Sequence, residues 1–187
     1  MFYGLMSGIL WGLDTVLLGI AIAMTPFIET EQAIFLAPFV STFLHDLFSS
    51  IWMAIYMMFK KQIGKTIKAA KTRSGRFIML GAILGGPVGM TGYLLAIKYI
   101  GPAYTAIISS LYPAVGAFFS FIFLKEKMKP SSIIGLLLSI AGIIALGYVP
   151  SGEVNNLAIG FIFALMCVIG WASEAVICAY GMKEEEI

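Results

Sequence analysis

The sequence predicts an all-α integral membrane protein, and both its composition and the arrangement of its apolar residues indicate this class. Of its 187 residues, 60% are apolar, 13% are aromatic and only 12% are charged. A chain of this composition is solvated mostly by lipid. Its apolar residues form six long runs without the alternation that barrel strands show. Because backbone groups in lipid must be hydrogen-bonded within their own segment, a helical bundle is expected.

Each apolar run is long enough, or nearly long enough, to cross a bilayer as a helix. In chain order the six runs cover residues about 3–25, 33–59, 77–99, 102–124, 132–149 and 157–181. The first run has no basic leader and is longer than the core of a signal peptide, so we expect it to be retained as a helix. Basic segments follow the second and fourth runs, and acidic segments follow the first and fifth. The polar segments therefore separate the predicted helices.

The basic residues predict how the helices are oriented, because short cytoplasmic loops retain positive charge. Seven of the twelve Lys and Arg residues lie in the segment 60–76, and the same side of the membrane gains Lys125, Lys127, Lys129 and Lys183. The opposite loops carry Glu29, Glu31 and Glu153. We therefore expect both termini to be cytoplasmic. The basic run has no interleaved aromatic residues, which favours contact with anionic membrane lipids over nucleic acid.

Two tryptophans lie three residues before a carboxylate inside apolar runs: Trp11 before Asp14, and Trp171 before Glu174. An ionised group in hydrocarbon costs about 2.5 to 3.5 kcal/mol, so such groups persist mainly where they line a cavity or bind a ligand. Asp46 is a third deep acid, and no deep Lys or Arg balances it. An acid beside an aromatic face suits an organic cation. These residues therefore predict a cation site.

Tyr112 is a candidate third aromatic face for this site, although packing around the kink at Pro113 explains it equally well. The tryptophans have the alternative role of interfacial anchors, and the acids that of protonated structural groups. The scattered methionines and phenylalanines form no metal-ligand cluster, so no metal site is expected.

His45 and Asp46 are neighbours in the second predicted helix. Their side chains should diverge by about 100°, so we expect them not to pair and each to need another partner. A histidine within the membrane near acids is a candidate proton relay, because imidazole exchanges protons near neutral pH. The alternative is a neutral histidine bonded to a backbone carbonyl.

Glycines predict where the helices approach closely and where the third helix is interrupted. Small residues recur every four positions at Gly4, Gly8 and Gly12 and again at Gly81, Gly85 and Gly89, a spacing that permits close helix contact. Gly86 and Pro87 should interrupt the third helix near its middle, where a broken backbone exposes carbonyls or acts as a hinge.

The first and sixth helices resemble each other. Placing Trp11 over Trp171 aligns Gly4–Asp14 with Ala164–Glu174. Five helices separate the starts of the two copies, and an odd number inverts the second copy. This predicts a first repeat over residues 1–149 and the first helix of a second repeat over 150–187. We expect the sequence to be truncated within that second repeat.

Two groups of motifs carry a family resemblance. Leu111–Pro113, Phe123–Glu126, Gly135, Leu136 and Gly142 resemble the EamA repeat of the drug/metabolite transporter superfamily. HDLFS from His45, GPVGM from Gly86, AIKYIG from Ala96 and CVIGWASEAV from Cys167 are similar, more narrowly, to bacterial choline uptake permeases of the LicB type.

The resemblance implies a ten-helix secondary transporter that takes up choline through a site between its repeats, without a cofactor but with possible proton or sodium coupling. Carried over by position, the candidate site residues are Trp11, His45, Asp46, Tyr112, Trp171 and Glu174. Asp14 departs from the permease pattern, which has a small residue there, so it is expected to alter selectivity or coupling.

Other functions remain to be weighed against choline uptake. The EamA pattern also fits an exporter of amines, drugs or other metabolites, and a membrane subunit that does not transport is a further alternative. An enzyme is not expected, because the chain has one histidine, no HExxH motif and no GxSxG motif.

Overall fold

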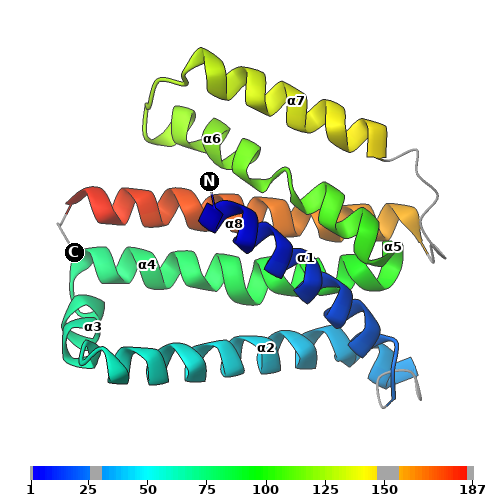
Figure 1. The fold of residues 1–187 in the computed structure, drawn as a ribbon, viewed down its shortest axis with the longest axis horizontal. Helices are drawn as coiled ribbons and strands as arrows, with labels where there is room; N and C mark the ends of the chain where they lie inside the picture. The colour runs from blue at the N-terminus through cyan, green and yellow to red at the C-terminus, as the bar shows by residue number, and fades with distance from the viewer. Residues whose placement is uncertain (1, 26–30, 147–155, 185–187) are drawn as a thin grey trace.

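The computed structural model describes residues 2–25, 31–146 and 156–184, and within these ranges the chain is helical without a strand. Its elements, drawn in Figure 1, are α1 (Phe2–Ile22), α2 (Glu31–Phe59), α3 (Ile63–Ala70), α4 (Arg73–Ile83), the π-helix η1 (Leu84–Met90), α5 (Thr91–Ser109), α6 (Tyr112–Phe123), α7 (Pro130–Leu146) and α8 (Leu157–Glu184). The predicted all-α fold is confirmed. The predicted repeat boundary at 149/150 lies outside the described residues, as do Glu29 and Glu153.

Three described stretches are long and apolar enough to cross a membrane: Gly4–Ile22, Arg73–Ser109 and Leu157–Met182. Two shorter apolar helices cover Tyr112–Phe123 and Ile133–Ala145. α2 is 29 residues long but carries His45 and Asp46 near its middle, and it is not among the three. The basic segment that we expected to be a loop contains the short helix α3.

The predicted third and fourth helices meet at Gly101. Its φ of 79° and ψ of 164° break the helix within α5, a conformation that only glycine adopts without strain. Pro102 follows and restarts the helix. The fourth helix is then interrupted again between Ser109 and Tyr112. The predicted segment 102–124 therefore consists of two helical pieces rather than one.

The predicted interruption of the third helix at Gly86 and Pro87 is confirmed, because η1 separates α4 from α5 there. Proline has no N–H to donate and its ring crowds the preceding turn, which displaces the α-helical hydrogen bonds. A π-helical turn is a common way to accommodate such a disturbance, and it often occurs at functional sites.

α8 lies along α4, η1 and α5, and this contact forms the centre of the bundle (Figure 1). The core there includes Leu94, Ile97, Ala164, Cys167 and Ala172. α1 crosses α5 obliquely, and α2 lies along the opposite side of η1 and α5 from α8 (Figure 1). α6 packs against α8, and α7 contacts α5. The α2–α3–α4 and α6–α7 connections lie at the same end of the bundle, which agrees with the shared side predicted for the basic residues.

The two glycine stripes differ in what they contact. Gly81, Gly85 and Gly89 face side chains of α8, as close helix packing requires. Gly4, Gly8 and Gly12 have no heavy atom of another described element within 4 Å of where a Cβ would be. The prediction of close packing is therefore confirmed for the third helix and wrong for the first within the described chain.

Candidate functional site

Aromatic rings from four helices gather at the centre of the bundle. The ring of Trp171, on α8, lies 6.1 Å from Trp11 of α1, 5.5 Å from Tyr112 of α6 and 5.2 Å from Tyr93 of α5, measured between centroids. Trp11 also stacks on Tyr93 at 6.3 Å. The structure thus brings together the three aromatic residues that the sequence predicted, although they are separated by up to 160 positions in the chain.

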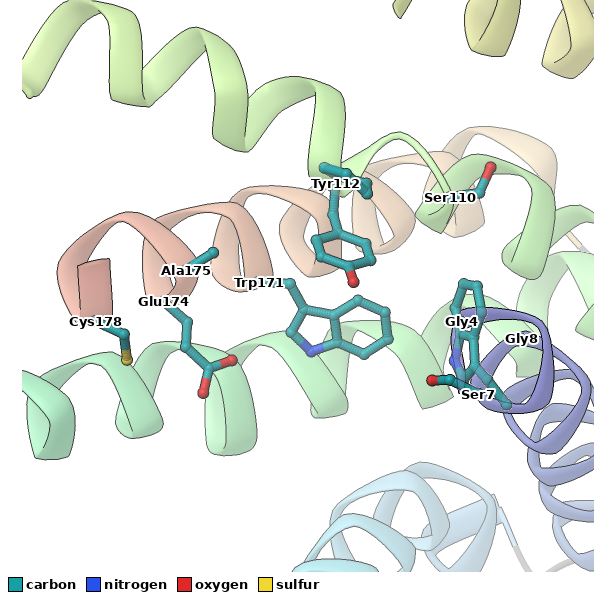
Figure 2. A pocket seen from close by; sticks show the side chains of 11 residues that line it. Gly4, Ser7, Gly8, Ser110, Tyr112, Trp171, Glu174, Ala175 and Cys178 are labelled. Atoms are coloured by element: carbon teal, nitrogen blue, oxygen red, sulfur yellow. The ribbon is translucent and has the colours of Figure 1, made fainter. Parts of the chain in front are cut away.

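A cavity of about 760 Å³ lies beside these rings. It is lined by Gly4, Ser7, Gly8, Trp11, Ser110, Tyr112, Pro113, Trp171, Glu174, Ala175 and Cys178. Figure 2 shows Trp171 and Tyr112 side by side at this cavity, with the carboxylate of Glu174 beyond the indole. Among the described residues, Glu174 is the one carboxylate in the lining, and no Lys or Arg accompanies it. The cavity therefore combines aromatic faces with a single negative group.

Two glycines of η1 position the α8 side chains. The indole N–H of Trp171 donates to the carbonyl of Gly85 at 3.1 Å. A methyl group on Gly85 would overlap the carboxylate of Glu174, and one on Gly89 would come within 2.6 Å of Cδ1 of Trp171. The bare backbone of η1 therefore makes the space in which both side chains lie.

Tyr93 is a site residue that the sequence reasoning missed. It is 1% exposed, and its hydroxyl pairs with the Thr15 hydroxyl. Since Thr15 donates its proton to the carbonyl of Trp11 at 2.8 Å, Tyr93 must be the donor in the other bond. The sequence did contain a signal that Tyr93 faces α8, because Tyr93 follows Gly85 and Gly89 at the same four-residue spacing.

Asp14 is not in the lining of this cavity but reaches α2, where its Oδ2 lies 3.9 Å from Nε2 of His45. Nδ1 of His45 is 3.0 Å from Oδ1 of Asp46. The prediction that His45 and Asp46 do not pair is therefore wrong. Their Cβ atoms diverge around the helix, but both side chains are long enough for the ring and the carboxylate to turn toward each other. Asp14, His45 and Asp46 form an acid–imidazole–acid chain between α1 and α2.

Asp46 and Glu174 approach η1 from different helices. Gly86 faces the carboxylate of Asp46 on α2, and Gly85 faces that of Glu174 on α8. Two successive glycines thus lie between two acids. Within the described residues, no group of three or more His, Cys, Asp or Glu side chains has an arrangement that holds a metal ion.

Comparison with known proteins shows that this chain is similar to transporters. The model of the EamA-like transporter family matches residues 1–148. Protein LicB of Haemophilus influenzae (strain ATCC 51907 / DSM 11121 / KW20 / Rd) is 42% identical over 104 residues. That alignment covers 56% of this chain and 36% of LicB, so the chain matches about a third of the relative's length. No solved structure matches the chain.

Proposed function

This multi-pass membrane protein belongs to the EamA-like transporter family, and from that premise we propose that it is a secondary transporter of a small organic cation, with choline as its substrate. The proposed direction is uptake across the bacterial cytoplasmic membrane, with the N-terminus on the cytoplasmic side. The proposed architecture has ten helices, in which a second repeat supplies the remaining wall of the cavity beside Trp171.

The observation that carries this proposal is the grouping of Trp11, Tyr112 and Trp171 at one cavity with Glu174. A quaternary ammonium has no hydrogen to donate, so aromatic faces and a nearby carboxylate are the groups that recognise it. The indole N–H of Trp171 is already bonded to Gly85, which leaves the ring face as its contribution. At about 760 Å³, the cavity has the size usual for small-molecule sites.

The resemblance to LicB-type permeases and the 42% identity to LicB support choline as the substrate. An exporter of amines is the second candidate, and one observation favours it. Ser7 and Ser110 line the same cavity. Their hydroxyls are able to accept hydrogen bonds from the N–H groups of a primary or secondary amine, which choline lacks.

Proton coupling is proposed for the chain of Asp14, His45 and Asp46. The imidazole lies between carboxylates of two helices, at 3.9 Å and 3.0 Å. A proton on His45 would be attracted to both acids, and its loss would weaken the link between α1 and α2. A histidine in this position can tie proton movement to relative movement of the two helices.

The test compares uptake of labelled choline by the intact protein with that of Trp171→Ala and Trp52→Ala. Trp52 provides the matched control because it is 70% exposed on α2 and is not in the lining of the cavity. We expect Trp171→Ala to lose most uptake and Trp52→Ala to keep it. Equal uptake by both variants would refute the proposed site. If the protein prefers primary amines to choline as its substrate, that result would favour the exporter.

A further inference from the structure

A second cavity, of about 690 Å³, lies on the α2 side of η1. Its polar lining consists of Thr42, Asp46 and Ser50 from α2 and Thr91 from α5, and Pro87 of η1 also lines it. Thr42, Asp46 and Ser50 recur every four residues and therefore share one face of α2. Asp46 is the one charged residue that the described part of the chain contributes to this lining. The cavity thus presents oxygen atoms and a single negative charge.

The Thr42 hydroxyl points to a ligand in this cavity. Thr42 is 5% exposed, and its Oγ1 is a buried atom without a hydrogen-bond partner among the described residues. A helical threonine often donates to the carbonyl four residues earlier, as Thr15 and Thr105 do here. Thr42 does not make that bond. A buried hydroxyl that has given up water without gaining a partner is costly, which favours a bound group that uses its oxygen.

The oxygen atoms lie close together along the helices. Gly86 faces Asp46, and a methyl group on Gly86 would be 3.0 Å from Oδ2 of that carboxylate. α2 runs antiparallel to η1 and α5 (Figure 1). One turn along both helices therefore brings Thr42 level with Thr91. The residues that carry the two hydroxyls and the carboxylate therefore fall within about 8 Å along the helix axis.

Pro87 of η1 lines the same cavity. Because proline has no N–H to donate, the irregular backbone of η1 begins beside these oxygen atoms. Phe39, Phe43 and Met166 supply apolar lining around these oxygen atoms.

We propose that the side-chain oxygens of Thr42, Asp46 and Thr91 bind a sodium ion. Oxygen donors suit a hard cation, and the carboxylate of Asp46 matches its single positive charge when the neighbouring imidazole of His45, 3.0 Å away, is neutral. The proposed sodium binding is argued from the cavity lining and the unpaired Thr42 hydroxyl, whereas a role in coupling rests on the proposed transport function. For a role in coupling, η1 would connect the two sites. Gly86 faces the carboxylate of Asp46 at the proposed sodium site, and Gly85 faces the carboxylate of Glu174 at the substrate cavity.

The experiment measures thermal unfolding of the intact protein in lipid nanodiscs without choline. Sodium chloride is titrated against potassium chloride and against ammonium chloride at constant ionic strength. We expect sodium alone to raise the melting temperature of the unmodified protein. Thr42→Val should weaken the apparent sodium affinity roughly tenfold, and Asp46→Asn should abolish the effect. Thr105→Val is the matched control, because Thr105 is buried but bonded to Gly101 and is not in the lining.

The stability of Thr42→Val in potassium gives a second readout, which distinguishes a threonine that binds sodium from one with only a structural role. Removing an unpaired hydroxyl should leave the protein equally or more stable in potassium while reducing its stabilisation by sodium. An unchanged sodium response in Thr42→Val would overturn the proposal, as would equal stabilisation by potassium. Equal stabilisation by ammonium would overturn it in favour of a protonated amine. Choline binding in sodium-free buffer, followed by tryptophan fluorescence, is measured separately, so failure of the substrate site is distinguished from failure of the sodium site.

Discussion

The indole N–H of Trp171 and the backbone carbonyl of Gly85 are joined by a hydrogen bond of 3.1 Å between α8 and η1. This bond fixes the ring that Trp11, Tyr93 and Tyr112 surround. It also makes the substrate cavity dependent on the backbone of η1, because Gly85 supplies the carbonyl that positions the indole. Changes in η1 are therefore expected to reach the cavity through Trp171.

Gly89→Ala tests this dependence. The added methyl group would approach Cδ1 of Trp171 to 2.6 Å and force the indole to shift. We expect choline affinity to fall by roughly tenfold or more, measured by calorimetry on the intact protein. Gly142→Ala is the control, because its methyl group meets nothing within 4 Å and should leave affinity unchanged. Unaltered binding by Gly89→Ala would show that Trp171 does not hold the substrate.

Tyr93→Phe tests the role of the buried hydroxyl. The ring and its contacts with both tryptophans remain, whereas the hydrogen bond to Thr15 is lost. The expected loss of stability is about 1 kcal/mol, measured by denaturation in detergent, with a smaller effect on choline affinity than that of Tyr93→Ala. Tyr56→Phe removes a hydroxyl from a side chain that is 55% exposed and should change stability little. An equal effect of the two Phe variants would contradict the assigned bond.

The two cysteines report on the cavity without any mutation. Cys178 lines it near Glu174, whereas Cys167 is fully buried. A cationic methanethiosulfonate reagent should label Cys178 but not Cys167, and choline should slow that labelling. Mass spectrometry of the digested protein identifies the labelled residue. Labelling of Cys178 at a rate independent of choline would place the substrate elsewhere.

His45→Gln tests proton coupling. Glutamine keeps a hydrogen-bonding side chain between Asp14 and Asp46 but does not gain or lose a proton. We expect uptake of choline to lose its dependence on pH while equilibrium binding of choline is retained. The measurement is uptake into proteoliposomes at a series of external pH values. An unchanged pH profile would eliminate His45 as the relay.

The sequence predicted the features that depend on composition and local chemistry. Long apolar runs must satisfy their backbone groups internally, so the helices followed from them. Gly86 with Pro87 predicted the irregular backbone because proline cannot continue the α-helical hydrogen bonding. The gathering of Trp11 and Trp171 was predicted from the acid that follows each tryptophan, but only Glu174 lines the cavity with them, whereas Asp14 reaches His45 of α2.

The features that depend on tertiary packing were not predictable in the same way. The stripes of Gly4 and Gly81 have the same spacing, but only the second faces a neighbouring helix among the described residues. The four-residue spacing identifies one face of a helix, but it does not indicate which neighbouring helix packs against that face. The pairing of His45 with Asp46 depends on side-chain torsions that position along a helix leaves free. Tyr93 resembled an ordinary core residue until its hydroxyl partner was known.

The central claim is that aromatic faces and the carboxylate of Glu174 hold a small organic cation. The most direct test is equilibrium binding of choline and of its neutral isostere 3,3-dimethylbutan-1-ol to the intact protein and to Glu174→Gln. The two ligands have nearly the same shape and differ in charge. We predict that the unmodified protein prefers choline by roughly thirtyfold and that Glu174→Gln reduces this preference. Equal affinity for choline and the neutral isostere in the unmodified protein would contradict the claim.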